Sequence, residues 1–191
     1  LRPTYLIGNH GIENPAATRD TLRLAHQLCV KWIAALRAPS KAGLNNVDIE
    51  DKYYSLALHY RAAPDRVQTR RALLRAVRTL TPAPRIVPGK MVINLLPLNA
   101  PDKGQAVQQL LHDTNIQHTL FIGDDVTDED VFTLRDRRIV SVRVGRSAAS
   151  HARYYLRTQN EINLLLQYLI HQLSTTLIQS NRDQCVRLPS R

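Results

Sequence analysis

The chain has 191 residues, enough for one domain with a sizeable core, or for one domain that carries a smaller insert. Hydrophobic residues make up 43% of the chain and charged residues 22%, as in an ordinary globular protein. No apolar run approaches the roughly 18 residues that a membrane helix needs, so we expect no membrane partner. A signal-peptide pattern is lacking and the two cysteines are too few for a disulfide framework, which favours a cytoplasmic location.

The formal net charge is +10 and the isoelectric point is near 10.1, which raises the question of nucleic acid. The arginines are spread along predicted helices, without the aromatic motifs or the cysteine and histidine spacing of nucleic-acid-binding modules. We therefore predict no nucleic-acid partner; such a role would require an affinity that falls steeply with salt. A basic surface also suits an anionic, phosphorylated substrate, because it steers the substrate toward the protein.

Hydrophobic periodicity, caps and turn residues predict an alternation of helices and strands along the chain. In chain order we predict a strand at 5–7, a glycine turn at 8–11, a helix at 18–37, an extended segment at 47–60, a helix at 64–80, a strand at 91–96, a helix at 103–113, a strand at 119–122, a short helix at 128–135, a strand at 140–144 and an amphipathic helix at 161–173.

Two regimes stand out in this order. From about residue 85 strands and helices alternate, as in a parallel α/β sheet, whereas residues 14–84 suit a small α+β insert. We therefore predict a core strand and hinge at 1–13, an inserted domain at 14–84, an α/β core at 85–173 and a flexible tail at 174–191.

Three carboxylates follow the buried strand at 119–122 within six residues of Gly123, namely Asp124, Asp125 and Asp128. Ligands bind outside the carboxyl ends of strands in α/β sheets, so the position favours a site. Carboxylates this close raise each other's pKa, and a hard divalent cation such as Mg²⁺ would relieve that repulsion. The alternative is a simple helix start, with Thr127 or Asp128 as its cap; this explains residues 127–130 well and residues 124–125 poorly.

The segment Pro101-Asp-Lys-Gly104 opens a predicted helix. Lys103 presents a cation where a helix N-terminus already favours an anion, and Gly104 would let a phosphate come close. A solvated loop lysine is the alternative for Lys103 on its own. Together with Asp124 and Asp125, which follow one strand later, the lysine describes a phosphoryl-transfer centre.

The extended segment at 47–60 and the residue after it place several polar side chains on one face, because side chains alternate along a strand. Such a face suits a polyhydroxyl ligand, and its cations could hold a phosphate. An ordinary half-exposed sheet would carry the same kinds of residue. The side chains concerned are Glu50, Lys52, Ser55, His59 and Arg61.

The chain resembles the trehalose-6-phosphate phosphatases, a branch of the haloacid-dehalogenase-like phosphohydrolases. The resemblance runs from about residue 5 to residue 170 and rests on a set of motifs in this order. They are Gly8-Asn-His-Gly11-x-Glu13, Glu50-Asp-Lys-x-x-Ser-x-x-x-His-Tyr-Arg61, Gly89-Lys-x-Val92, Asp102-Lys-Gly104 and Gly123-Asp-Asp-x-Thr-Asp-Glu-Asp-x-Phe132.

The resemblance implies an α/β fold, with a Rossmannoid haloacid-dehalogenase-like core at 85–173 and a small α/β cap domain at 14–84 that closes over the substrate. It implies Mg²⁺-dependent hydrolysis of trehalose 6-phosphate to trehalose and phosphate. In that family an aspartate attacks the phosphate to give an aspartyl-phosphate, and a second aspartate two residues later moves the proton. A synthase domain ahead of this chain would fit some members.

Carried over by position, Lys103 resembles the lysine that binds the phosphate, and Asp124 resembles the metal ligand. Asp125 and Asp128 stand beside Asp124 as supporting or alternate ligands, and we class them with Lys103 as catalytic residues. The residues predicted to meet the substrate are Glu50, Lys52, Ser55, His59 and Arg61 in the cap, and Asn9 and His10 at the hinge.

The chain departs from the family pattern in three places. It contains no Asp-x-Asp-Gly-Thr nucleophile motif and no following Ser-Gly-Arg; Asp128-Glu-Asp130, at a helix start, is not a candidate. Asn94 stands where many relatives carry Glu. We expect the missing motifs upstream of Leu1, in a longer protein whose N-terminal part this chain lacks, and we expect the chain alone to be inactive. The alternative is a non-catalytic fragment that binds sugar phosphates or regulates.

Overall fold

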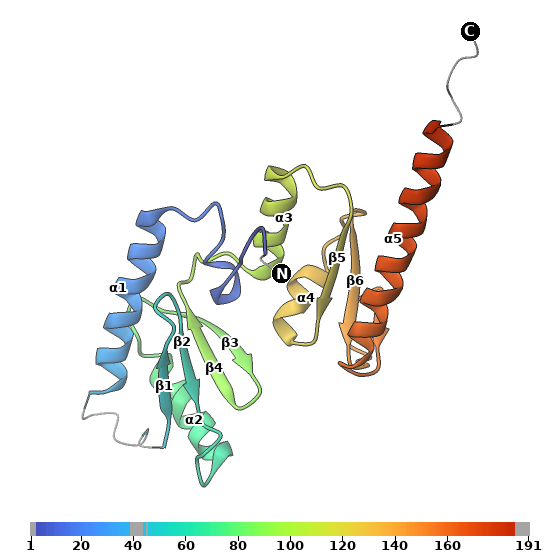
Figure 1. Cartoon of the computed structure of the whole chain (residues 1–191). Coiled ribbons are helices and arrows are strands. Elements are labelled where there is room, and N and C mark those ends of the chain that lie inside the picture. The colour runs from blue at the N-terminus through green and yellow to red at the C-terminus, as the bar shows by residue number, and fades with distance from the viewer. Residues whose placement is uncertain (1–2, 39–43, 45, 186–191) are drawn as a thin grey trace.

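The computed structural model describes residues 3–38, 44 and 46–185. Figure 1 shows two sheets side by side, each with its own helices. We call them the antiparallel unit, which contains strands β1 to β4, and the parallel unit, which contains strands β5 to β7. None of the helices in the described part of the chain has the length and apolar content needed to cross a membrane.

The antiparallel unit is a four-stranded sheet in the order β1-β2-β4-β3, with two helices on one face. Every neighbouring pair in this sheet is antiparallel. Its elements are α1 (Arg19–Leu36), β1 (Asp48–Asp51), β2 (Leu56–His59), α2 (Arg66–Val77), β3 (Arg85–Gly89) and β4 (Val92–Leu96).

Helix α1 begins as predicted, because the Thr18 side chain accepts a hydrogen bond from the Thr21 backbone N–H at 3.2 Å. Its buried residues recur at helical spacing, and they face the core that α1 shares with α2 and the sheet. Trp32 is fully buried in this core, and its Nε1 donates to the Pro82 carbonyl at 2.7 Å. The predicted helices at 18–37 and 64–80 are therefore confirmed, with slightly shorter bounds.

The prediction that residue 85 opens the parallel core is wrong. Strands β3 and β4 form a hairpin that completes the antiparallel sheet, with Gly89 opposite Val92. Two residues, Lys90 and Met91, join the strands, and a connection this short can only join antiparallel neighbours. Pro88 is tolerated because β3 lies at the edge of the sheet. The antiparallel sheet therefore ends at Leu96, so the boundary between the two units lies after Leu96 and not after residue 84.

The parallel unit is a three-stranded sheet in the order β5-β6-β7, with α3 and α4 on one side of it (Figure 1). Its core gathers Leu111, Val131 and Ile139, from α3, α4 and β6. The elements are α3 (Lys103–Asp113), β5 (Thr119–Gly123), the 3₁₀ helix η3 (Val126–Asp128), α4 (Glu129–Phe132), β6 (Ile139–Val144) and β7 (Tyr154–Leu156). The predictions for 103–113, 119–122 and 140–144 are confirmed to within a residue.

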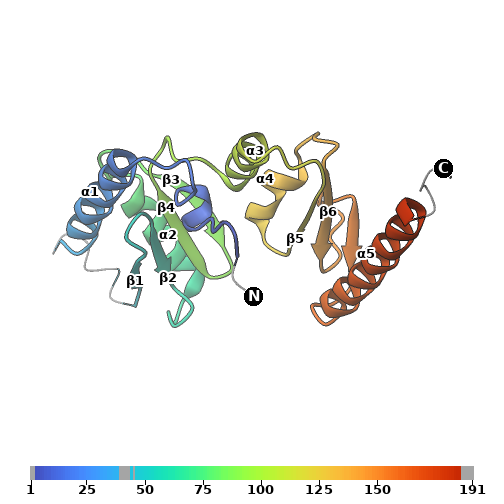
Figure 2. The ribbon, with the colours of Figure 1, turned by 45° about the horizontal axis from the view of Figure 1, so that its top comes forward.

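The predicted strand at 5–7 is not formed. These residues pair with neither sheet, and Leu6 is 78% exposed. A strand needs a hydrogen-bonding neighbour, and here the first backbone pairing is the isolated bridge between Gly8 and Glu13. The 3₁₀ helix η1 (Asn9–Gly11) follows and lies between the two sheets, as Figure 2 shows.

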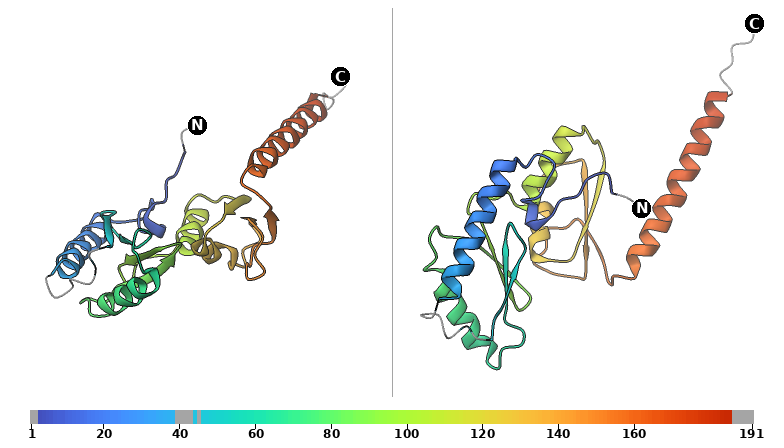
Figure 3. Two further views of the ribbon diagram at one scale, coloured as in Figure 1. Left: turned by 90° about the horizontal axis from the view of Figure 1, so that it is seen from below. Right: turned by 60° about the vertical axis from the view of Figure 1, so that its left-hand side comes forward.

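Helix α5 (Glu161–Cys185) is longer than the predicted helix at 161–173 and extends away from both sheets (Figure 3). Residues 174–185, predicted to be part of a flexible tail, continue the helix; residues 186–191 lie outside the described part. No glycine or proline interrupts 174–185, and helix propagation is cooperative once a helix has formed.

The core of the antiparallel unit gives a test of the fold. Leu58 lies fully buried at the centre of β2, so Leu58→Ala should lower the free energy of unfolding by about 2–5 kcal/mol through lost burial and a cavity. Leu24, 55% exposed on α1, provides the control, and Leu24→Ala should change the free energy by less than about 0.5 kcal/mol. Urea unfolding followed by circular dichroism compares them; equal losses would contradict the assigned core.

Candidate functional site

A cavity of about 490 Å³ lies where η1, the β1–β2 connection and the parallel unit meet. Its size is that of a small-molecule site. Five of the predicted site residues line it, namely Asn9, His10, Lys52, Lys103 and Asp128. The remaining wall comes from Ile7, Gly8, Gly11, Val107, Phe121 and Ile122.

Asp128 is the most engaged side chain at this cavity. Its residue is 5% exposed, and its Oδ1 accepts a hydrogen bond from Lys103 Nζ at 2.7 Å. Its Oδ2 accepts hydrogen bonds from the backbone N–H groups of Asp124 and Asp125, both at 2.8 Å. The carboxylate therefore ties the start of α3 to the loop that leaves β5, and both its oxygens are in use.

Two glycines allow this packing. A side chain at Gly123 would overlap the Asp128 carboxylate, so β5 must end in glycine for that carboxylate to turn under the loop. Gly104 is buried, and a side chain there would overlap the backbone carbonyl of Asp130 in α4. The predicted role of Gly104 in letting a phosphate approach is therefore wrong, because the glycine serves the contact between α3 and α4.

Lys103 is the first residue of α3, and its side chain is 29% exposed. The Asp102 side chain accepts a hydrogen bond from the Gln105 N–H at 2.7 Å, and the Gln105 side chain accepts one from the Asp102 N–H at 3.1 Å. This capping box fixes the first turn of α3 and with it the root of the lysine. One face of the ammonium meets Asp128, and the others remain available to an anion in the cavity.

Asn9 joins the hinge to the antiparallel unit. Its Nδ2 donates to Glu13 Oε2 at 2.6 Å and to the Lys52 carbonyl at 3.1 Å, while its Oδ1 accepts a hydrogen bond from Ser55 Oγ at 2.7 Å. Asn9 has φ of 47°, in the left-handed region that asparagine tolerates better than most residues. The predicted residues Asn9 and Ser55 therefore hold the β1–β2 connection beside the cavity, and Lys52 reaches it from there.

Of the two predicted hinge residues, His10 is the one whose pKa is shifted by its surroundings. Burial lowers the pKa of its imidazole below the ordinary 6.5, and the positive charges of Lys103 and Lys52 lower the pKa further. A hydrogen bond with the buried Asn94 and the charge of Asp125 act in the opposite direction. The cavity thus concentrates positive charge around a neutral imidazole, which favours an anionic ligand.

Asp124 and Asp125 lie at the exposed end of β5, where the resemblance implies a metal. The Asp125 side chain caps η3 by accepting from the Val126 N–H at 2.7 Å, whereas no hydrogen bond or ion pair engages the Asp124 carboxylate among the described residues. Asp124 therefore fits as one oxygen ligand of Mg²⁺, an ion that keeps several waters. The described residues contain no ready-made cluster of three metal-binding side chains.

Of the five cap residues predicted to meet the substrate, only Lys52 lines the cavity; Glu50, Ser55, His59 and Arg61 do not. Glu50 Oε2 lies 2.8 Å from His59 Nε2 and 3.8 Å from Lys52 Nζ, and the hydrogen bond with His59 lowers the pKa of Glu50. His59 and Arg61 line a different hollow, of about 660 Å³, at the far end of β2. The alternation of side chains along a strand correctly predicted that Glu50 and His59 share one face of the sheet. It does not predict how far along the strand each side chain lies from the cavity.

Arg143 and Glu129 support the loop after β5, although no sequence pattern singled them out. Arg143 in β6 donates to the Asp124 carbonyl at 3.0 Å and pairs with Glu129 at 2.9 Å. Glu129 also accepts a hydrogen bond from the His151 backbone N–H at 2.9 Å. Nothing in the local sequence around Arg143 or Glu129 indicates these contacts.

Comparison with known proteins places the chain among the relatives of one enzyme family. The trehalose-phosphatase family profile matches residues 2–159. A probable trehalose-phosphate phosphatase of Sinorhizobium fredii is 33% identical over 144 residues, which cover 73% of this chain and 54% of that protein. Trehalose-6-phosphate phosphatase of Escherichia coli is 30% identical over 104 residues, which cover 53% of this chain and 39% of that protein. The chain thus spans about half or less of these two curated relatives.

Two solved structures share the fold. One is a trehalose-6-phosphate phosphatase related protein, with a TM-score of 0.60 and 19% identity over 85% of this chain and 66% of that chain. The other is the C-terminal domain of a trehalose synthase regulatory protein from Candida albicans, with a TM-score of 0.57 and 13% identity over 76% of this chain and 64% of that chain. These likenesses confirm the predicted α/β fold.

The central role of Asp128 is tested by comparing two neighbouring carboxylates. Asp128→Ala should lower the free energy of unfolding by about 2–3 kcal/mol, because Lys103 and two backbone N–H groups lose their partner. Asp124→Ala should change it by less than about 0.5 kcal/mol, because that carboxylate is exposed. Denaturant unfolding at neutral pH measures both, and equal losses would show that Asp128 does not organise the loop.

The charge of the cavity can be measured through His10. Its pKa should lie below 6.5 in the free chain and should rise when inorganic phosphate neutralises the nearby lysines. Because the folded chain holds the neutral form, His10 contributes stability above pH 6.5 that is lost as pH falls through the lowered pKa. An NMR titration of the imidazole, assigned with His10→Gln, gives the value; a pKa above 6.5 in the free chain would rule out this electrostatic description.

Proposed function

Because this chain belongs to the trehalose-phosphatase family, we propose that it is the phosphate- and sugar-binding part of a trehalose-6-phosphate phosphatase. The observation that carries the proposal is the cavity in which Lys103 and Asp128 of the parallel unit face Asn9, His10 and Lys52. The reaction proposed is hydrolysis of the phosphomonoester to trehalose and phosphate.

Lys103 would bind the phosphate. The Asp128 carboxylate holds its ammonium at the N-terminus of α3, where the helix dipole adds to the positive potential. Phosphate oxygens accept strong hydrogen bonds from such a cation. Lys52 brings a second positive charge to the same cavity from the other unit, which is a reason for the phosphate to lie between the two lysines.

The sugar would be held by the antiparallel unit, which we propose as the cap. Asn9, Ser55 and Lys52 are linked by hydrogen bonds that cross from the hinge to the β1–β2 connection. A ligand that pulls on this connection would also pull on the hinge, so sugar binding and cap position would be coupled. Glu50 would take part only through Lys52, which lies 3.8 Å from it.

The residues at the end of β5 suit a divalent metal, and we propose Asp124 as its ligand from this chain with Asp125 beside it. When bound, Mg²⁺ would neutralise charge on the phosphate. Asp128 would act on the reaction only through Lys103 and the loop, because both its oxygens already accept hydrogen bonds within the protein. This reassigns Asp128 from catalytic residue to positioning residue.

The nucleophile is the part that these 191 residues do not provide, since no Asp-x-Asp-Gly-Thr sequence occurs in them. We propose that turnover by way of an aspartyl-phosphate requires a longer protein that carries that motif. The same sequence feature favours a second candidate function, in which the chain binds sugar phosphates without hydrolysing them.

Calorimetric titration with trehalose 6-phosphate tests the binding site. The chain should bind the ligand, and Lys103→Ala should weaken binding at least about tenfold, because a charge-assisted hydrogen bond to phosphate is lost. Lys90→Ala removes the same charge from an exposed hairpin turn and should leave affinity within about twofold. Unchanged affinity in Lys103→Ala would overturn the proposed site.

Phosphate release separates the two candidate functions. With Mg²⁺ and trehalose 6-phosphate, the chain alone should release no phosphate, whereas a longer version that carries the nucleophile motif should do so. In that version Asp124→Asn should reduce the rate by about 100-fold or more, because the proposed metal ligand is impaired. A folded longer version that binds the ligand but releases no phosphate would support the binding function instead.

A further inference from the structure

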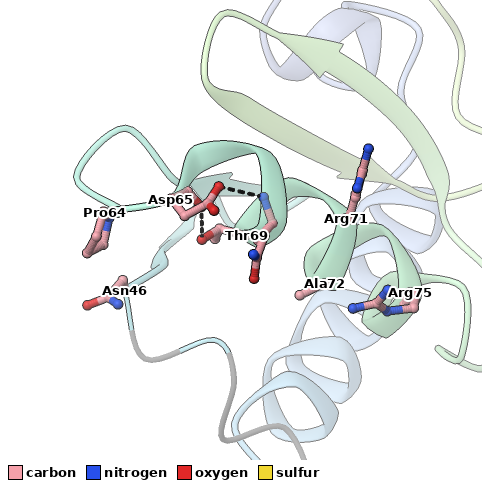
Figure 4. Close-up of a pocket in the computed structure, with 8 residues that line it drawn as sticks. Asn46, Pro64, Asp65, Thr69, Arg71, Ala72 and Arg75 are labelled. Atoms are coloured by element: carbon pink, nitrogen blue, oxygen red, sulfur yellow. Dashed lines mark hydrogen bonds between the residues drawn. The ribbon is translucent and has the colours of Figure 1, made fainter.

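A further hollow lies on the antiparallel unit and shares no residue with the cavity that Lys103 and Lys52 line. It has a volume of about 500 Å³ and runs along helix α2 (Figure 4). Eight residues line it, namely Asn46, Pro64, Asp65, Gln68, Thr69, Arg71, Ala72 and Arg75. Six of the eight are polar, so the hollow suits a polar occupant.

The cationic end of the hollow consists of Arg71 and Arg75. The two are four residues apart on α2, so they lie on neighbouring turns of one face. Both are exposed, and neither side chain makes an ion pair or hydrogen bond among the described residues. Like charges at this spacing repel each other, and an anion held between them would remove that repulsion.

Helix α2 itself contains no acidic side chain that could neutralise these arginines. The helix and its C-terminal cap carry Arg66, Arg70, Arg71, Arg75 and Arg78, and no Asp or Glu lies between residues 66 and 78. The excess of positive charge is therefore continuous along the helix. Among these arginines, only Arg71 and Arg75 line the hollow.

The other end of the hollow is suited to hydroxyl groups. Figure 4 shows Asn46, Pro64 and Asp65 at one end and Arg71 and Arg75 at the other. Asp65 caps α2 by accepting a hydrogen bond from the Gln68 N–H at 2.9 Å, and its backbone carbonyl accepts one from Thr69 Oγ1 at 2.6 Å. The Asn46 and Gln68 amides and the Asp65 carboxylate are hydrogen-bonding groups of the kind that suits sugar hydroxyls.

The spacing of the two ends fixes the orientation of a ligand. A helix rises about 1.5 Å per residue, so Arg71 and Arg75 lie about 9 and 15 Å along the axis from Asp65. A phosphate near Asp65 would be repelled by its carboxylate, whereas one near the arginines would be attracted by their two positive charges. The anionic group must therefore lie at the arginine end, and the neutral part at the Asp65 end.

We propose that this hollow is a second binding site, which takes a small phosphorylated polyol with its phosphate on Arg71 and Arg75. The site lies on the helix-bearing side of the antiparallel unit, apart from Lys103. An occupant would bridge the start and the third turn of α2, and α2 packs on the same core as β2 and β4. Occupancy would thereby stiffen the unit that carries Lys52, whether or not the chain takes part in phosphate hydrolysis.

A nucleic acid fits this hollow less well than a small molecule does. A nucleic-acid backbone presents phosphates in a continuous row, and one passing through the hollow would place a phosphate beside Asp65. The hollow is also concave and of the volume that small ligands occupy. A single phosphate joined to a hydroxyl-rich body matches the separation of charge along α2.

The test uses glucose 6-phosphate as the probe, with inorganic phosphate and glucose for comparison, in calorimetric titrations of a Lys103→Ala chain. Lys103→Ala removes the phosphate-binding lysine of the first cavity, so the remaining binding reports on α2. Adding Arg71→Ala and Arg75→Ala should weaken binding of glucose 6-phosphate at least about tenfold. Arg70→Ala with Arg78→Ala removes the same charge outside the hollow and should change affinity by less than about twofold.

A second readout keeps the test independent of the Lys103→Ala background. In the otherwise unchanged chain, the arginine Nε–H NMR signals of Arg71 and Arg75 should shift on addition of glucose 6-phosphate and not on addition of glucose. Equal weakening by both arginine pairs, or shifts absent from Arg71 and Arg75, would overturn the site. Equal affinity for inorganic phosphate and glucose 6-phosphate would overturn the hydroxyl-binding end.

Discussion

The carboxylate of Asp128 is the interaction on which the geometry of the candidate site depends. One oxygen holds the ammonium of Lys103 at 2.7 Å, and the other holds the backbone of Asp124 and Asp125. A nearly buried carboxylate is costly without partners, and three donors supply them. Because α3 and the end of β5 meet at this one group, Lys103 and Asp124, the proposed phosphate-binding and metal-binding residues, are positioned relative to each other before any ligand arrives.

Asn9 is a second polar centre. Its side chain fixes the position of η1, as the Asp128 carboxylate fixes the start of α3. Its amide contacts Glu13, the Lys52 carbonyl and Ser55, and so joins η1 to the β1–β2 connection. The cavity lies between these two centres, with one lysine contributed from each side. The two lysines lower the pKa of the half-buried His10, which is the electrostatic reason for proposing an anionic ligand here.

Short-range patterns in the sequence predicted much of this arrangement. Caps and helical spacing placed α1 and α3 to within a residue or two, and the run of acids after β5 includes Asp128, which lines the cavity. Strand β3 was not predicted because a proline such as Pro88 argues against a strand, although an edge strand tolerates it. The hairpin turn is also only two residues long. The contacts of Asn9 join residues up to 46 apart in sequence, which no local pattern reveals. His59 lies at a different hollow from Lys52 because β2 carries the chain away from the β1–β2 connection at about 3.3 Å per residue.

The central claim is that the sugar phosphate binds between the two units with its phosphate on Lys103. A crystal structure of the chain with trehalose 6-phosphate tests it most directly. The account predicts a phosphate oxygen within about 3 Å of Lys103 Nζ, the Lys103–Asp128 pair intact, and the sugar beside Asn9 and Lys52. Trehalose 6-phosphate bound elsewhere, or Lys103 turned away from the phosphate, would contradict it.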